Sequence, residues 1–169
     1  MRYISAYQHV CYKFSVSGQP TPAPRLTQAR KFDPRLHADR PPPELAQELA
    51  QEARAQVITR GYYAFKAAVV AALIDAYPTE MLLQQHIVMT GHPFQFRPGR
   101  EGPCAIVEYW LFMAQTGTSR CTHGDPDNIA KAILDALFRD DRHVLPRCQG
   151  LTCGVERPHV DIHVTLIGA

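Results

Sequence analysis

Hydrophobic positions along the chain predict four strands, with helices between the first and second and between the second and third. Residues 8–17, QHVCYKFSVS, are rich in β-branched and aromatic types and stop before Gly-Gln-Pro, which indicates an opening strand. Residues 104–114, CAIVEYWLFMA, have little polarity, which is typical of a central strand covered on both faces. HVLP at 143–146 and HVDIHVTLI at 159–167 predict two further strands, the last with strict alternation of polar and apolar residues.

The first interval between strands carries a long helical pattern. Residues 44–57, ELAQELAQEARAQV, follow three prolines and are dense in Ala, Leu, Glu and Gln, so they predict a helix. Gly61 is expected to bend or interrupt this helix before it resumes over 62–77. The resumed helix should bury a stripe formed by Phe65, Val69, Ala72 and Leu73. The order of elements predicts an α+β fold with a small mixed β-sheet packed against helices.

Length and composition limit the class of protein. The 169 residues fit one domain, 1–169, with a polar insertion at 78–103. The opening MRYISAYQHV lacks the apolar run of a secretory signal, and no stretch reaches the roughly 18 apolar residues of a membrane span. We therefore expect a cytoplasmic protein with no membrane partner. Five cysteines, odd in number and unevenly spread, are expected to be free thiols.

The charge is nearly balanced over the whole chain. A net charge of +2 does not indicate a general nucleic-acid binder, so any basic surface must be local. Residues 19–40 carry five cations against two acids, and a solvated loop would explain the same excess. The residues of this segment that could guide phosphates are Arg25, Arg30, Lys31 and Arg35.

The stretch GDPDNIAKAILDALFRDD, 124–141, carries the candidate chemistry. Helical geometry puts Asp127, Lys131 and Asp135 on one face and the apolar residues on the opposite one. Pro126 suits the first helical position and Asp125 the N-cap before it. Taken singly, each of these residues is explained as a cap or as a partner in an i,i+4 ion pair.

The combination of these residues is less easily explained by capping alone. Asp127 and Asn128 crowd beside the cap, while Asp140 and Asp141 follow the helix, where its dipole disfavours negative charge. Carboxylates held close together repel unless a cation offsets them, and Mg²⁺ prefers oxygen ligands. With Lys131 near the phosphate, such a site could hydrolyse a phosphodiester.

The run DPDNIAKAILDAL followed by RDD resembles the signature of RusA-type Holliday junction resolvases, in which D-x-D-N-x-x-K opens a helix and a D-D pair follows before a strand. The resemblance covers 8–37, 54–76 and 104–167, and leaves 38–53 and 78–103 as insertions. It implies a RusA-like homodimer that binds four-way (Holliday) DNA junctions and nicks them with Mg²⁺, without a small-molecule cofactor. Two sites related by a two-fold axis suit a two-fold symmetric substrate.

Carried over by position, the resemblance implies metal ligands at Asp125, Asp127 and Asp141, with Lys131 as the catalytic lysine and Asn128 supporting the site. The chain departs from the family between D-A-L and D-D, where only two residues intervene instead of several. A helix that ends near Asp135 would let the following acids return to the site, and Asp140 could then replace Asp141. A helix that runs on to 138 would carry these acids away, over about 19 Å.

Two functions therefore remain open, a Mg²⁺-dependent endodeoxyribonuclease and a junction-binding dimer that has lost cleavage. Structural zinc is a further alternative to free thiols, although the spacing is loose for its ligands, Cys121, His123, Cys148 and Cys153. His159, Asp161 and His163 are interpreted as the polar side of a strand. Trp110 is interpreted as a core residue rather than a base-stacking platform, because its strand is expected to be covered on both faces.

Overall fold

The computed structural model describes residues 9–23, 60–79, 92–94, 104–114 and 126–167. The strands are β1 (His9–Ser17), β2 (Ala105–Met113), β3 (Val144–Cys153) and β4 (His159–Ile167), and the helices are α4 (Pro126–Leu137) and a helix over residues 60–76. All four predicted strands are confirmed, and β3 extends well beyond HVLP. The helix predicted over 44–57 lies outside the described residues.

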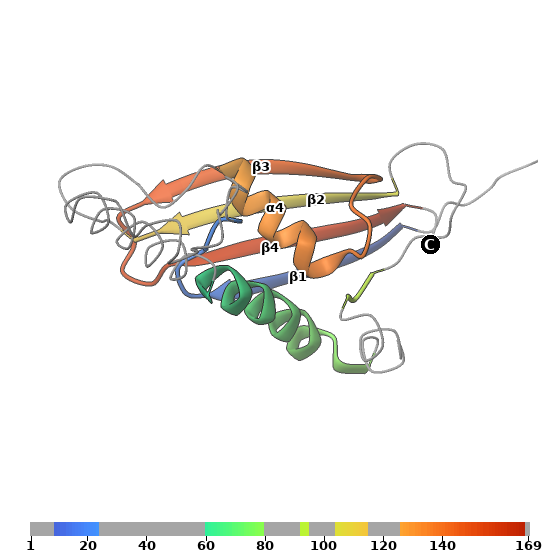
Figure 1. Cartoon of the computed structure of the whole chain (residues 1–169), viewed down its shortest axis with the longest axis horizontal. Helices are drawn as coiled ribbons and strands as arrows, with labels where there is room; N and C mark the ends of the chain where they lie inside the picture. The colour runs from blue at the N-terminus through green and yellow to red at the C-terminus, as the bar shows by residue number, and fades with distance from the viewer. Residues whose placement is uncertain (1–8, 24–59, 80–91, 95–103, 115–125, 168–169) are drawn as a thin grey trace, which may run out of the picture.

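The four strands form one mixed sheet in the order β1-β4-β2-β3 (Figure 1). β4 runs antiparallel to both of its neighbours, whereas β2 and β3 are parallel and are joined through α4. The short link from β3 to β4 crosses the end of β2, where the amides of Gly154 and Val155 donate to the carbonyl of Met113. The predicted α+β fold with a small mixed sheet is therefore confirmed.

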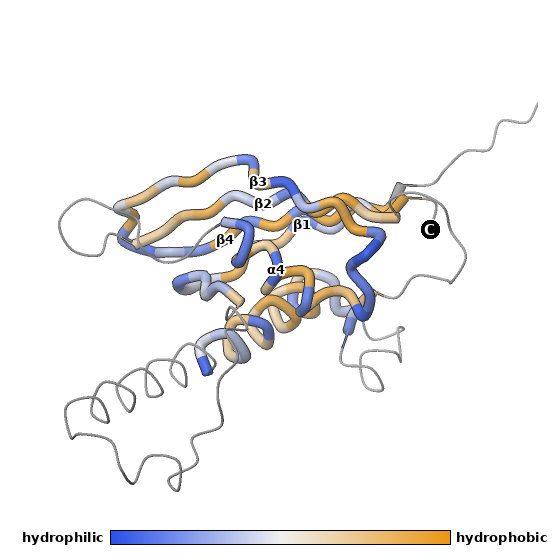
Figure 2. Tube along the Cα trace, turned by 45° about the horizontal axis from the view of Figure 1, so that its top comes forward, coloured by the Kyte–Doolittle hydropathy of each residue, from blue (hydrophilic) through white to orange (hydrophobic). Residues whose placement is uncertain are grey.

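Both helices lie on the same side of the sheet (Figure 2). β2 is a central strand, as predicted, but the expectation that it is covered on both faces is wrong for the described part of the chain. Val107 and Leu111 are buried beneath the helices, whereas Glu108, Trp110 and Phe112 on the other face are only half-buried. The sequence hid this alternation because two residues of the uncovered face are themselves aromatic.

The core is built from the helix-facing positions of the sheet and from one stripe on each helix. Phe65, Val69 and Leu73 of the predicted stripe are buried, and Ala72 packs against them. α4 contributes a broad apolar face whose buried residues are Ile129, Ala130, Ala132, Ile133, Leu134, Ala136 and Leu137. At about 1.5–3 kcal/mol for each large side chain removed from water, this face fixes which side of α4 remains exposed.

Gly61 is the second described residue of the helix over residues 60–76, and the expected bend or break between this helix and 44–57 lies outside the described residues. A Cβ at this position would lie 3.1 Å from Cγ2 of Thr21, so the missing side chain lets the segment after β1 approach the helix closely. The glycine serves packing between two segments, which local propensity cannot indicate.

Part of the segment interpreted as an insertion belongs to the core. Phe94 is buried and forms a bridge with Phe138, directly after α4. The amide of Phe94 donates to the carbonyl of Leu137 at 2.9 Å, and the amide of Arg139 donates to the carbonyl of Phe94. These bonds satisfy backbone groups that a helix end leaves without partners, and they mark the C-terminal boundary of α4.

The cysteines do not all remain thiols. Cys11, Cys104 and Cys148 are thiols, as expected, but Cys153 at the end of β3 is disulfide-bonded, which corrects the expectation for that residue. A cysteine in a disulfide cannot ligate zinc, so the four-residue zinc alternative loses one of its ligands. Sequence spacing did not reveal the bond because disulfides form between positions that tertiary structure brings together.

Candidate functional site

α4 presents the candidate residues on its solvent side, while its apolar face rests on the sheet. The hydroxyl of Tyr109, on β2, donates to the carbonyl of Pro126 at 3.2 Å and so ties the first turn of α4 to the sheet. The helix begins at Pro126, as predicted. Asp125 and its expected capping role lie outside the described residues.

Asp127 and Asn128 occupy the first turn of α4. Asp127 is exposed, and Asn128 is half-buried with its carbonyl accepting a 2.9 Å bond from the amide of Ala23. This turn is the positive end of the helix dipole, which attracts negatively charged groups. The position also suits an ion or a phosphate approaching from solvent.

The segment after β1 runs to this end of α4. The side-chain oxygen of Gln19 accepts a 3.0 Å bond from the amide of Ala114 just after β2, and Ala23 then meets Asn128. Beyond Ala23, the four predicted phosphate-guiding residues lie outside the described part of the chain: Arg25, Arg30, Lys31 and Arg35. The described residues show only that the basic segment departs beside the first turn of α4.

Lys131 lies one turn after Asp127, on the exposed side of the helix. Its Nζ is 3.5 Å from Oδ1 of Asp135, which confirms the predicted i,i+4 ion pair. The other oxygen of Asp135 accepts a 2.7 Å bond from the hydroxyl of Tyr62, on the helix over residues 60–76. Burial and this bond to the carboxylate raise the pKa of the Tyr62 hydroxyl well above its usual value, so Tyr62 remains a neutral donor.

The second pair of acids lies beyond the other end of α4. Asp140 accepts bonds from the guanidinium and the amide of Arg142, with Nε 2.9 Å from Oδ1. These bonds lower the pKa of the Asp140 carboxyl to about 2. The carbonyl of Asp141 accepts from the amide of Val144 at 3.0 Å, in the turn that starts β3.

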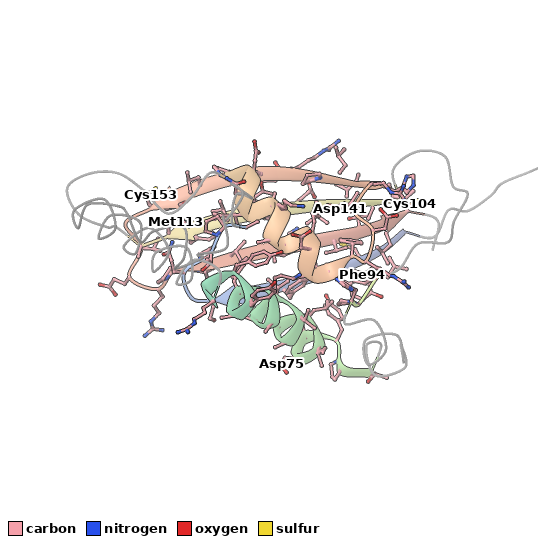
Figure 3. The ribbon with its side chains drawn as sticks, viewed as in Figure 1. Asp75, Phe94, Cys104, Met113, Asp141 and Cys153 are labelled. Carbon is pink, nitrogen blue, oxygen red and sulfur yellow. The ribbon has the colours of Figure 1, made fainter. Side chains whose placement is uncertain are left out.

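The structure therefore does not bring Asp127 together with Asp140 or Asp141 within one chain. α4 runs its full length to Leu137, and twelve residues at 1.5 Å each put about 18 Å between its ends. Figure 3 shows Asp141 in the connection between α4 and β3, at the end remote from the first turn. Since Mg²⁺ holds its ligands at about 2.1 Å, one ion cannot bind Asp127 and Asp141 of the same chain. Among the described residues, no three acidic, histidine or cysteine side chains gather as a metal site.

The sequence analysis did not identify two residues that hydrogen-bond the candidate acids: Tyr62, which donates to Asp135, and Arg142, which donates to Asp140. Tyr62 precedes Phe65 by three positions and so continues the buried stripe of its helix, a signal that was available. Arg142 stands two residues after Asp140, and a local side-chain clamp at that spacing has no periodic signature.

Comparisons with protein-family models, with curated proteins and with solved structures find no match. The resemblance to RusA-type resolvases therefore rests on the motif of residues 124–141 and on the order of the elements around it. No helix among the described residues is both long and apolar enough to span a membrane.

Proposed function

We propose that this protein is a Mg²⁺-dependent endodeoxyribonuclease that acts on four-way DNA junctions as a homodimer. The observation that carries the proposal is the exposed first half of α4, where Asp127 and Lys131 stand one turn apart. An acid that can hold a divalent cation and a lysine that can meet a phosphate oxygen are what phosphodiester hydrolysis requires.

The surroundings of these two residues support the same reaction. Asp135 forms an ion pair with Lys131 and accepts a hydrogen bond from the hydroxyl of Tyr62. The ion-pair partner of the lysine, one turn further along α4, is therefore itself fixed in position. The basic segment departs beside Asn128, at the end of α4 where phosphate binding is favoured by the helix dipole. The cations that follow Ala23 in the sequence are the residues proposed to guide the phosphates.

The proposed metal ligands at this end are Asp127 and its neighbour in sequence, Asp125. Mg²⁺ bound there would supply an activated water and would offset charge on the phosphate. In a homodimer the last acid, Asp141 or Asp140, could come from the second copy, since within one chain the length of α4 separates it from Asp127. Of these two acids, Asp140 already forms an ion pair with Arg142 within its own chain.

A junction-binding protein without cleavage is the second candidate. It is favoured by one observation, the placement of Asp140 and Asp141 beyond the far end of α4. With only Asp127 and its neighbour in sequence, Asp125, as ligands, the metal would lack an acid that the resemblance implies.

A junction assay separates the two candidates. A synthetic mobile four-way junction and a linear duplex are incubated with the protein in Mg²⁺ or in EDTA, and the strands are resolved on a denaturing gel. Paired nicks that require both Mg²⁺ and the junction support the nuclease. A retarded but uncut junction supports the binding protein, and equal affinity for junction and duplex contradicts both.

A further inference from the structure

The sheet face opposite the helices carries two pairs of aromatic rings on its inner strands. The rings of Phe112 and His159 stack 4.2 Å apart with an interplanar angle of 7°. The indole of Trp110 lies 4.6 Å from the ring of His163 in a tilted arrangement. All four side chains are half-buried, so each pair remains in contact with solvent. We refer to these residues as the four rings.

The register of the strands spreads the four rings over three successive rows across the sheet, so Trp110 and His163 lie diagonally to each other. Phe112 is the direct partner of His159, and Trp110 lies opposite Asp161, two positions before His163 along the chain. On the other side of Trp110 stands Gly150, where a Cβ would lie 3.2 Å from Cδ1 of the indole. A side chain at position 150 would therefore crowd the indole, and glycine leaves room for it across β3.

Positive charges flank these rings on the two edge strands. Lys13 on β1 is the register partner of His163, and Arg147 on β3 is the partner of Glu108. Both cations are exposed. The hydroxyl of Tyr77 bonds the amide and the carbonyl of Lys13, which fixes the backbone from which the lysine extends.

Two acids share the inner strands with the rings. Glu108 accepts a 2.6 Å bond from the side chain of Gln149, and Asp161 lies beside Trp110. Carboxylates repel phosphate groups, but they accept hydrogen bonds from the amino groups of bases. The face thus has rings and acceptors in its middle and cations at its edges, which is complementary to a nucleotide whose base lies inside and whose phosphate lies outside.

We propose that this face binds unpaired nucleotides of DNA, with bases stacked on the four rings and phosphates near Lys13 and Arg147. Stacking on aromatic side chains combined with flanking cations is the physical basis of single-strand recognition. The inference extends the proposed function, because a branched substrate can offer unpaired bases, but the binding it describes requires neither the metal nor the acids of α4.

The test uses the chain's single tryptophan as its probe. A twelve-residue oligothymidylate is titrated into the full-length protein in EDTA while the emission of Trp110 is recorded, and binding is followed in parallel by anisotropy of a labelled oligonucleotide. We expect saturable quenching that follows the anisotropy change. A duplex of the same length should quench much less, because its bases are already stacked.

Matched variants locate the binding surface. Phe112→Leu keeps apolar volume but removes one ring, and should weaken oligonucleotide binding by about tenfold. Tyr63→Leu removes a ring that is 63% exposed on the helix over residues 60–76, on the covered side of the sheet, and should change nothing. Arg147→Gln should reduce the salt dependence of binding by about 0.7 in the slope of log affinity against log salt.

Three results of the oligonucleotide titrations would overturn the proposal: binding without a change in Trp110 emission, equal losses for Phe112→Leu and Tyr63→Leu, or no binding at millimolar oligonucleotide. If protein alone shows a concentration-dependent shift of Trp110 emission together with dimer sedimentation, the face belongs to a second copy and the proposal is wrong. Since the titration contains EDTA, a protein that never cleaves junctions can still pass it. A protein that cleaves without quenching would fail this inference alone.

Discussion

The hydroxyl of Tyr62 donates a 2.7 Å hydrogen bond to Oδ2 of Asp135, across 73 positions of sequence. The bond joins the helix over residues 60–76 to α4 at the turn that carries Lys131. Because Asp135 also pairs with Lys131, a residue near the core is connected to the exposed face proposed to meet DNA.

Tyr62→Phe should destabilise the protein by about 1.5 kcal/mol, the lower end for a hydrogen bond to a charged group. The ring and its packing remain, so the loss reports on the bond to Asp135. Urea unfolding followed by circular dichroism measures it, with Tyr63→Phe as the control at an exposed neighbour. An unchanged midpoint for Tyr62→Phe would show that the bond contributes nothing to stability.

The same bond predicts a pH dependence. Burial first, and then the bond to Asp135, raise the pKa of Tyr62 in the folded protein. A raised pKa contributes stability below the unfolded value of about 10, and this contribution is lost as the pH rises above it. The difference in unfolding free energy between the wild type and Tyr62→Phe should therefore shrink between about pH 9 and pH 11. If the difference in unfolding free energy stays constant over this range, the pKa of Tyr62 is not raised in the folded protein.

Arg142→Gln should raise the pKa of the Asp140 carboxyl, because it removes the hydrogen bonds from the guanidinium that lower it. The arginine holds the pKa of Asp140 at about 2, and without it the midpoint should return toward the usual value of about 3.9. Because the folded pKa is lowered, the associated stability is present above about pH 4 and is lost as the pH falls through about 2. Carboxyl-carbon NMR during an acid titration reads the midpoint directly. A midpoint near 2 in the variant would assign the shift to another group.

Asp127→Asn should abolish nicking of a four-way junction while leaving binding unchanged or tighter. The change removes a proposed metal ligand and one negative charge from the phosphate path, and it keeps the size of the side chain. Asp75→Asn is the matched control, because Asp75 is an exposed acid on the helix over residues 60–76 (Figure 3). Cleavage by Asp127→Asn at the rate of the control would rule out a metal site at the first turn of α4.

Gly61→Ala should stabilise the protein by less than the roughly 1 kcal/mol expected from helix propensity, because the new Cβ would press on Cγ2 of Thr21. Removing that methyl group with Thr21→Ser should restore the gain. A double-mutant cycle by urea unfolding measures the coupling, which should favour the double variant by at least about 0.5 kcal/mol. Additive effects would mean that Thr21 moves aside without cost.

The candidate site shows where sequence reasoning ends. Residue spacing was enough to place Asp127, Lys131 and Asp135 on one exposed helix face, since helical geometry is local. It left open whether Asp140 and Asp141 return to that face, because this depends on where α4 ends. The end is set by Phe94, whose backbone bonds Leu137 and Arg139 from a distant part of the chain.

The amino-acid pattern by itself determined the four strands, the stripe Phe65, Val69 and Leu73, and the amphipathic α4, because hydrophobic periodicity reports which side of an element is buried. Only the tertiary structure decided that both helices cover the same sheet face, which leaves Trp110 half-exposed. The reason is that an aromatic side chain reads as apolar in a sequence whether a helix or solvent lies over it. Which face of the sheet a helix covers depends on how the strands and helices are connected in space (Figure 2). That arrangement depends on contacts between residues far apart in the sequence.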